Sequence, residues 1–142
     1  MNPEIPNAQC PMPGLLTGGQ PSEAQLEQAR DAGYRAILNL RGLGEPGTDV
    51  EAAIVEGLGM SYVHLPVSGP VDISVEKARE LAVALEQVEE PVMVHCASGN
   101  RVGALFALKA FHLDGRSVDE ALAIGRSSGL TRMEPLVRSL LG

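Results

Sequence analysis

The sequence has few aromatic residues and no excess of positive charge. Aromatic residues make up 3% of the 142 positions, tryptophan is absent, and the formal net charge is −7 at pH 7. Proteins that bind nucleic acids use basic surfaces and aromatic stacking platforms, and a negative protein is repelled by phosphate backbones and anionic membrane surfaces. We therefore predict neither nucleic acid nor membrane as a partner. A small anionic substrate or a phosphorylated molecule is still compatible with the net negative charge, because a local cationic pocket is enough to bind it.

Metal ligands, disulfides and long apolar runs are also scarce. The two cysteines, Cys10 and Cys96, lie far apart, and the three histidines, His64, His95 and His112, are dispersed. No zinc-type Cys-x-x-Cys or His-x-x-x-His spacing occurs, so we expect no metal, no cofactor and no disulfide framework. No apolar stretch reaches transmembrane length, and the first residues lack the features of a secretory signal. The expected location is the reducing cytoplasm.

What the sequence does contain is enough apolar material for one domain. Apolar residues make up 44% of the chain, and four prolines precede residue 14. The prolines predict an extended N-terminal arm over residues 1–13, outside regular structure, which leaves residues 14–142 as the domain. Strand-like apolar runs then alternate with helical patterns. We predict a single α/β domain with a mainly parallel sheet of four to five strands, flanked by helices.

Capping signals place most of the helices. In a capping box, Ser or Thr is followed three residues later by Glu or Gln, and each side chain bonds the backbone amide of the other residue. Four such patterns occur, over residues 22–25, 48–51, 117–120 and 131–134. With the apolar periodicity they predict helices over about 22–32, 48–58, 75–89, 102–113, 117–124 and 131–140. Strands are expected over about 15–20, 35–40, 61–67 and 92–95.

The most informative stretch joins the last predicted strand to the apolar helix that follows. It places Cys96 at the end of the strand, before a turn of small residues. Backbone N–H groups converge at such a helix start, and an anion bound there lies on the sulfur. The same donors and Arg101 favour the thiolate form of Cys96, although a buried structural cysteine is the plainer alternative. The predicted anion-binding residues are Ala97, Ser98, Gly99, Asn100, Arg101 and Val102.

Loops at the ends of the other strands supply further candidates. Arg41 and Glu45 follow a predicted strand at the sheet edge where open α/β folds bind ligands, but solvated loop charges are equally compatible with the sequence. Asp72 follows the next strand and is a candidate general acid. Because Asp72 and Ser74 both suit a cap position, capping of the next helix is the alternative.

Four weaker candidates complete the set. His95 points to the opposite face of its strand from Cys96, so we expect it to buttress the loop rather than to transfer protons. Cys10 is either a resolving thiol for Cys96 or a spectator. Arg126 and Arg132 flank a loop of glycine and serine, where one of them supplies a second cation or both lie on the surface.

Together these residues resemble the tyrosine and dual-specificity phosphatase superfamily. More closely, the chain is similar over about residues 14–142 to the bacterial branch called beta-lactamase hydrolase-like, or phosphatase-like sulfur transferase. The resemblance implies a phosphatase-like fold in which Cys96 is the nucleophile, Arg101 binds the oxyanion and residues 97–100 supply amides. It is carried by His95-Cys96-Ala97-Ser98-Gly99-Asn100-Arg101, Gly19-Gln20-Pro21, Asn39-Leu40-Arg41 with Glu45, and Tyr62-Val63-His64-Leu65-Pro66-Val67.

The sequence departs from the phosphatase pattern in three ways. Four residues separate Cys96 from Arg101, whereas the phosphatase signature has five, and the shorter loop resembles that of rhodanese sulfurtransferases. The hydroxyl residue that usually follows the phosphatase arginine is replaced by Val102 and Gly103. The general acid has no clear counterpart, because Asp72 lies closer to the cysteine than the family pattern places it.

Three functions are therefore compatible with the sequence. The first is hydrolysis of a phosphomonoester through a covalent intermediate on Cys96, which the resemblance over most of the chain favours. The second is sulfur transfer through a Cys96 persulfide, which the loop length favours. The third is an inactive anion-binding or signalling module that keeps the same loop. The sequence does not predict the oligomeric state.

Overall fold

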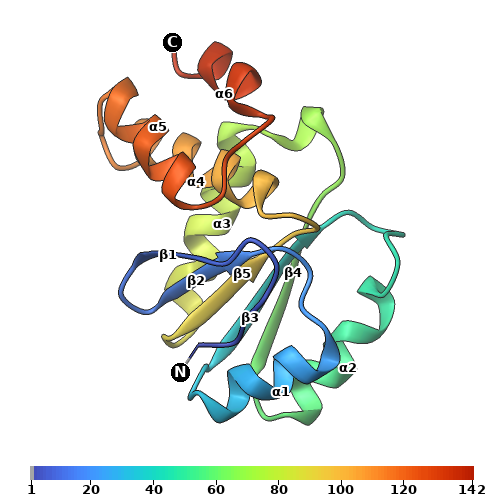
Figure 1. Ribbon diagram of the computed structural model, residues 1–142. Helices are drawn as coiled ribbons and strands as arrows, with labels where there is room; N and C mark the ends of the chain where they lie inside the picture. The colour runs from blue at the N-terminus through green and yellow to red at the C-terminus, as the bar shows by residue number, and fades with distance from the viewer. Residues whose placement is uncertain (1) are drawn as a thin grey trace.

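The computed structural model describes residues 2–142, which form a five-stranded sheet covered by helices on both faces (Figure 1). The strand order is β1-β2-β5-β3-β4, with parallel pairing throughout except for the antiparallel edge strand β1. This arrangement confirms the predicted mainly parallel α/β fold. The elements are β1 (Gln9–Met12), β2 (Leu15–Gly18), α1 (Glu23–Asp31), β3 (Ala36–Arg41), α2 (Thr48–Gly57), β4 (Ser61–Val67), the 3-10 helix η1 (Pro70–Asp72), α3 (Val75–Gln87), β5 (Val92–His95), α4 (Asn100–His112), α5 (Val118–Ser127) and α6 (Glu134–Leu140).

The central strands are apolar on both faces because helices cover both. Leu16, Ile37 and Met93 pack with α1 and α2, whereas Leu38 and Val94 pack on the opposite face with α3 and α4. Buried parallel strands carry such continuous apolar runs instead of alternating polar residues. Figure 1 shows α1 and α2 on one side of the sheet and the other four helices on the opposite side.

Helix α4 is the most buried helix. Every residue from Val102 to Leu108 is buried, and the helix packs on both α3 and α5. The apolar run in the sequence predicts this central position correctly. The helix begins at Asn100, two residues earlier than predicted, so Arg101 lies in its first turn.

Two of the four predicted capping boxes form. Ser22 with Gln25 and Ser117 with Glu120 each make both reciprocal hydrogen bonds, which fixes the starts of α1 and α5. The other two predicted boxes are wrong. At α2 the N-cap is Gly47, and at α6 it is Met133, and neither makes a side-chain cap bond.

The glutamates of the two failed boxes are used elsewhere. Glu51 is buried and bonds His95 across the core, so its carboxylate faces away from the helix start. Glu134 forms ion pairs with Arg126 and Arg138. In both cases a tertiary partner that can carry a charge is available. A hydrogen bond to a charged partner is stronger than the hydrogen bond to a backbone N–H that a capping box supplies.

The N-terminal arm contains regular structure that the sequence analysis did not predict. Residues Gln9–Met12 form β1, paired antiparallel with β2 in the register Gln9 to Thr17 and Met12 to Leu15. An edge strand tolerates Pro11, because one side of an edge strand has no ladder partner. Ile5 is buried and belongs to the apolar cluster on the α1 side of the sheet, so the arm takes part in the core.

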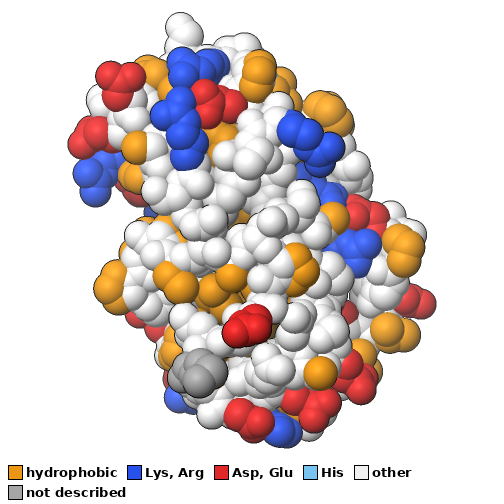
Figure 2. Space-filling view, viewed as in Figure 1, with side chains coloured by type: hydrophobic (Ala, Val, Ile, Leu, Met, Phe, Trp, Pro, Cys, Tyr) orange, Lys and Arg blue, Asp and Glu red, His pale blue; other side chains and the backbone are white. Residues whose placement is uncertain are grey.

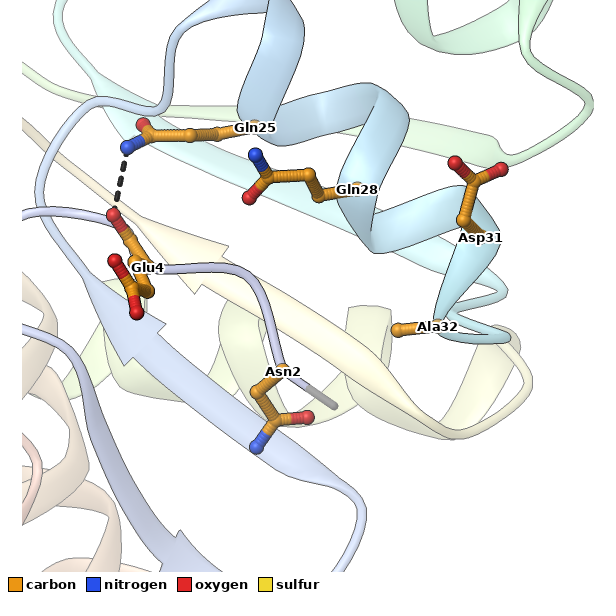
Figure 3. Close-up of a pocket in the computed structure, with 6 residues that line it drawn as sticks. All are labelled: Asn2, Glu4, Gln25, Gln28, Asp31 and Ala32. Atoms are coloured by element: carbon orange, nitrogen blue, oxygen red, sulfur yellow. Dashed lines mark hydrogen bonds between the residues drawn. The ribbon is translucent and has the colours of Figure 1, made fainter.

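The arm is also tied to α1, beside a cavity of about 510 Å³ (Figure 3). Gln25 Nε2 donates a hydrogen bond to the carbonyl of Glu4 at 2.6 Å. Glu4 and Asp31 line this cavity, and no lysine or arginine does. The cavity is therefore unsuited to the anionic ligand that the sequence predicts.

Candidate active site

The strand register brings the candidate residues to one edge of the sheet. His95 at the end of β5 lies opposite Gly18 on one neighbouring strand and Asn39 on the other. The loops after β2, β3 and β5 therefore meet at the carboxyl ends of the strands, which is where open α/β sheets bind ligands. No helix of the described residues is both long enough and apolar enough to cross a membrane.

The Cys96 loop is held by the residues that follow β2. Gln20 N–H donates to the Ala97 carbonyl at 3.1 Å, and Cys96 N–H donates to the Gly18 carbonyl at 3.2 Å. Within the loop, Gly99 N–H donates to Cys96 Sγ at 3.1 Å. Gly99 has φ of +93°, a left-handed conformation that lets the chain turn from the loop into α4.

The first turn of α4 supplies further donors. The amides of Asn100, Arg101 and Val102 have no earlier carbonyl of the helix to bond, so they are free to face an anion, and the helix dipole adds positive potential there. The side chains of Val102 and Cys96 are hardly accessible to a ligand, because Val102 is fully buried and Cys96 is 1% exposed. The loop therefore offers backbone N–H groups, and only a small reacting group can approach the sulfur.

Arg101 is clamped by Glu45. Its Nη1 donates to Glu45 Oε2 at 2.7 Å, and its Nη2 donates to Glu45 Oε1 at 3.0 Å. Nη1 also donates to the Val67 carbonyl at 2.8 Å. A guanidinium has five N–H donors, of which these contacts occupy three. The two that remain, on Nε and Nη2, share one edge, which is the geometry that binds two oxygens of a tetrahedral anion.

The charge on Glu45 is secured by its donors. The hydrogen bond from Arg101 is the largest cause that lowers the pKa of Glu45 to about 2, and bonds from the Gly42 amide and Arg41 add to it. In turn the Glu45 bond raises the pKa of Arg101 above its ordinary value, against the effect of burial, and the charge of Cys96 acts in the same direction. The pair thus stays ionised beside the sulfur.

Arg41 and Glu45 are hydrogen bonded within the network that reaches Arg101, and they are not solvated loop charges. Their side chains are 11% and 27% exposed. Arg41 donates to Glu45 Oε1 at 3.2 Å, to Gln20 Oε1 at 2.9 Å and to the Pro46 carbonyl at 2.7 Å. Solvated loop charges are therefore the wrong interpretation of these two residues, and their part in a binding site stays a prediction.

A buried carboxylate that sequence reasoning missed, Glu51, joins the same network. Its Oε2 lies 2.6 Å from His95 Nε2, and its Oε1 accepts a hydrogen bond from Gln20 Nε2 at 2.7 Å. Burial acts to raise the pKa of Glu51, but the hydrogen bond and charge of His95 and the Gln20 bond hold it below its ordinary value. The apolar neighbours of Glu51 in the sequence gave no signal of this role, since its spacing fits a capping box.

His95 therefore contacts both the core and the loop. Besides the Glu51 contact, its Nδ1 lies 3.3 Å from the Cys96 carbonyl. Each ring nitrogen of His95 thus lies against an oxygen, one on the carboxylate of Glu51 and one on the backbone of Cys96. These contacts fit the buttressing role predicted for His95. We call the series of side chains His95, Glu51, Gln20, Arg41, Glu45 and Arg101 the polar chain, because each is hydrogen bonded to the next.

Two candidates are not brought to this network. Asp72 Oδ2 accepts a hydrogen bond from the Ser68 amide at 2.9 Å within the turn after β4, and the N-cap of α3 is Ser74. Cys10 is exposed, bonds Asn2, and lines a cavity with Pro91, at the start of β5 rather than at its Cys96 end. Neither residue makes a hydrogen bond to the Cys96 loop among the described residues.

No cluster of three or more histidine, cysteine, aspartate or glutamate side chains suited to a metal ion occurs among residues 2–142. The donors around Cys96 are instead amides and guanidinium groups. Such donors bind oxyanions.

Sequence comparison identifies relatives of this chain. The family described as "Beta-lactamase hydrolase-like protein, phosphatase-like domain" matches residues 13–112. A beta-lactamase hydrolase-like protein of Xylella fastidiosa (strain Temecula1) is 37% identical over 120 residues, and one of Agrobacterium fabrum is 35% identical over 106 residues. The matches cover 81% and 72% of this chain but only 27% and 24% of those proteins, so the chain spans a minor part of their length.

Solved structures share the fold at low sequence identity. A Neisseria meningitidis protein has a TM-score of 0.76 at 23% identity, over 93% of this chain and 94% of that one. The core catalytic domain of the PP-IP phosphatase SIW14 from S. cerevisiae, in complex with citrate, has a TM-score of 0.72 at 17% identity, over 99% and 85%. P. aeruginosa TpbA, in complex with pTyr, has a TM-score of 0.67 at 16% identity, over 99% and 85%. The family match over most of the sequence, supported by this fold, shows that the chain belongs to the family of beta-lactamase hydrolase-like phosphatase-like domains.

Proposed function

We propose that this chain hydrolyses a phosphomonoester through a covalent phosphocysteine on Cys96. The observation that carries the proposal is Arg101 beside Cys96: Glu45 and the Val67 carbonyl occupy three of its five N–H donors, and the other two, on Nε and Nη2, are available to an anion. A phosphate placed there meets two guanidinium donors and the amides of the helix start. SIW14 and TpbA, which share the fold, are seen with the anions citrate and pTyr.

The reaction has two steps. The Cys96 thiolate attacks phosphorus, the phosphorus–oxygen bond to the leaving group breaks, and the leaving oxygen departs with a proton from water or a donor. A water molecule then attacks the phosphocysteine, the phosphorus–sulfur bond breaks, and inorganic phosphate and the thiolate result. Arg101 and the loop amides stabilise the negative oxygens in both steps.

The proton for the leaving group is the weak point of the site for this reaction. Asp72 is the general-acid candidate from the sequence, but its carboxylate is bound to the Ser68 amide. General acid catalysis contributes about a hundredfold or more to rate. We therefore expect esters with good leaving groups, such as aryl phosphates, to be the better substrates.

Sulfur transfer is the second candidate function, and the loop length favours it. Only four residues separate Cys96 from Arg101, and the sulfur is almost completely buried. In this reaction the Cys96 thiolate attacks the outer sulfur of thiosulfate, the sulfur–sulfur bond breaks, and sulfite leaves. The persulfide that remains on Cys96 then passes its outer sulfur to an acceptor thiolate. No proton donor is needed, since sulfite is a stable anion.

Both functions require a reduced thiol, which a cytoplasmic location supplies. Cys10 and Cys96 are both free of disulfides. The third candidate, an anion-binding module without turnover, uses the same amides and Arg101 but leaves Cys96 unmodified.

The experiment that separates these functions uses the intact mass of the protein. The purified chain is incubated with an aryl phosphate or with thiosulfate, and phosphate release is recorded in parallel. Phosphate release that is lost in Cys96→Ser and kept in Cys10→Ser supports the phosphatase. One added sulfur atom on Cys96 without phosphate release overturns the phosphatase in favour of sulfur transfer.

The binding-only function has its own signature. Neither substrate then reacts, but sulfate or phosphate still raises the melting temperature, because a ligand that binds only the folded state stabilises it. Cys10→Ser is the matched control throughout, since Cys10 is the other free thiol and is exposed.

A further inference from the structure

A second cavity adjoins the Cys96 loop on the side of α5 and α6. Its volume is about 420 Å³, and Ser98 of the loop forms part of its wall. The other lining residues come from the arm, from the last turn of α5 and from the segment between α5 and α6. They include Asn7, Gln9, Arg126, Thr131 and Arg132. No acidic side chain lines it.

The turn that carries Arg132 is attached directly to the loop. Asn100 is 5% exposed, and its Oδ1 accepts hydrogen bonds from the amides of Thr131 at 2.8 Å and Met133 at 3.3 Å. These two residues flank Arg132 in the sequence. Because Asn100 immediately precedes Arg101, one buried side chain fixes the position of Arg132 relative to the oxyanion-binding arginine.

Close backbone contacts hold the rest of the cavity wall. A Cβ on Gly129 would lie 2.6 Å from the Gly99 carbonyl oxygen, so these two segments touch without any side chain between them. On the arm side, Asn7 Nδ2 donates to the Ser98 carbonyl at 2.9 Å. The cavity is therefore bounded by segments that are each bonded to or packed on the Cys96 loop.

Arg132 is an uncompensated cation in this cavity. Arg126 is paired with Glu134 through two hydrogen bonds, and Arg41 and Arg101 share Glu45. Arg132 makes no ion pair among residues 2–142. Figure 2 shows basic side chains interspersed with acidic ones over the α5–α6 part of this face, whereas acidic side chains predominate at the lower edge over α1 and α2. In a chain of net charge −7, the cavity that contains Arg132 is therefore a place where a negatively charged group can bind.

We propose that Arg132 binds a second anionic group of the substrate, while the first is held over Cys96. This inference rests on the proposed function, because it assigns the reacting group to the Cys96 loop. It narrows the substrate class to small molecules with two anionic groups, the second being a carboxylate or a phosphate. Thr131 and Ser98 line the same cavity and offer neutral hydrogen-bonding groups beside Arg132.

The test compares ligands that differ in the second anion alone. Phenyl phosphate, carboxyphenyl phosphates and phenylene bisphosphates are titrated by calorimetry into Cys96→Ser, which binds without turnover. A charged hydrogen bond is worth about 1.5–3 kcal/mol, so the best doubly anionic ligand is expected to bind about tenfold or more tightly than phenyl phosphate. The carboxylate and phosphate arms show which second group is preferred.

Substitution of Arg132 then decides the inference. The quantity compared is the affinity for the best doubly anionic ligand divided by the affinity for phenyl phosphate. In Cys96→Ser with Arg132→Ala this ratio is expected to fall to about one. Arg132→Lys is expected to retain only part of the ratio, because lysine keeps the charge but lacks the planar fork of donors. Arg79→Ala is the matched control, since Arg79 is exposed on α3 and makes no ion pair among the described residues. It is expected to keep the full ratio.

Two results overturn the inference: a ratio near one in Cys96→Ser itself, or a ratio that survives Arg132→Ala. These results are distinct from failure of the proposed function, which is measured separately as phosphate release by the chain with Cys96 intact. Arg132-dependent binding in Cys96→Ser, together with no phosphate release by the chain with Cys96 intact, therefore supports the second site and counts against hydrolysis.

Discussion

At the scale of single residues, the candidate site depends on buried polar side chains that are paired with one another. Glu51 and His95 are both buried and lie 2.6 Å apart, in a position where an unpaired charge would be strongly destabilising. The pairing places the ring of His95 against the carbonyl of Cys96. Glu51 is thus a positioning residue: it acts on the loop through His95 and does not touch the reacting group.

Replacing Glu51 is expected to destabilise the fold and release the ring. Glu51→Ala leaves the buried His95 Nε2 without its acceptor, which costs about 1–3 kcal/mol, and leaves Gln20 Nε2 with the Pro21 carbonyl alone. Glu51→Gln is expected to cost less, because its amide oxygen still accepts one of the two bonds. Urea unfolding measures the stability, and the ¹⁵N shifts of the His95 ring report its hydrogen bonds. Glu56→Ala, exposed on the same helix, serves as the control and should change neither measurement.

Asp72 allows a second prediction at this scale. Its carboxylate is bound to the Ser68 amide, so it should contribute nothing that depends on the leaving group. We expect Asp72→Asn to change the turnover of aryl phosphates with good and poor leaving groups by the same factor. A steeper dependence of rate on leaving-group pKa in the variant would instead identify Asp72 as the proton donor.

Local sequence patterns predicted some of these residues and missed others. The spacing of Cys96 and Arg101, and the strand ends that carry Arg41 and Glu45, are visible in the sequence. The contact of Glu51 with His95 is not visible there, because the spacing of Glu51 equally fits a capping box. Only the folded structure brings His95 within 2.6 Å of this residue of α2. Buried polar pairs between distant segments are set by tertiary packing.

At the scale of elements, the anion-binding end of α4 is fixed by contact with the segment after α5. A Cβ on Gly103 would lie 2.1 Å from the backbone nitrogen of Leu130, and one on Gly125 would lie 2.8 Å from the Ala107 side chain. These glycines let α4 and α5 approach closely. The approach also sets where Thr131 meets Asn100, so helix packing determines the geometry beside the Cys96 loop.

Gly103→Ala is therefore expected to destabilise the protein even though alanine favours helices. Overpacking a tight contact costs about 1–3 kcal/mol, and here the obstacle is backbone that must move as a whole. Gly57→Ala in α2 is the matched control, because a Cβ there meets no atom within 4 Å. It is expected to raise the stability by about 0.5–1 kcal/mol. The denaturant midpoints of both variants measure the two changes in stability. Equal shifts of the two midpoints would contradict the prediction.

The prediction of elements was most accurate where the signal is local. The boxes at Ser22 and Ser117 use residues within one turn, and both form. The strand β1 was missed, since prolines disfavour a strand locally but the edge of the sheet tolerates them. The strand β1 forms because it pairs with β2, and the sequence of residues 9–12 alone does not indicate this partner.

At the scale of the whole molecule, acid stability follows from the carboxylates of the site and surface. The pKa of Glu45 is about 2 in the folded protein, against an ordinary value of 4.5. A lowered carboxyl pKa contributes stability above pH 4.5, and this contribution is lost as the pH falls toward 2. Glu134, whose pKa is also about 2 because of Arg126, acts over the same range.

The contribution of Glu45 can be isolated by difference. Glu45→Gln is expected to be less stable than the parent near pH 6, and the gap should close as the pH falls from 4.5 to 2. Thermal unfolding followed by circular dichroism across this range measures the gap. Glu76→Gln, exposed on α3, should follow the parent curve. A gap that stays constant with pH would show that Glu45 does not stabilise the fold through its charge.

The overall architecture was the most predictable level. Alternation of apolar strands and amphipathic helices is enough to indicate a mainly parallel sheet with helices on both faces. The meeting of the loops after β2, β3 and β5 follows from that topology. What the topology does not contain is the arm that crosses α1 and lines the second cavity, because its position depends on contacts with segments far away in the sequence.

The polar chain has a consequence for how this site can evolve. Its two ends, His95 and Arg101, are joined again through the backbone of the Cys96 loop, so the bonds form a closed circuit. Gln20 and Arg41 lie in the middle of this circuit, and a change at either one is transmitted to both ends. A single substitution at Gln20 or Arg41 is therefore expected to affect both Arg101 and the contact of His95 with the Cys96 loop. Descendants that alter this site must exchange its members in compensating pairs.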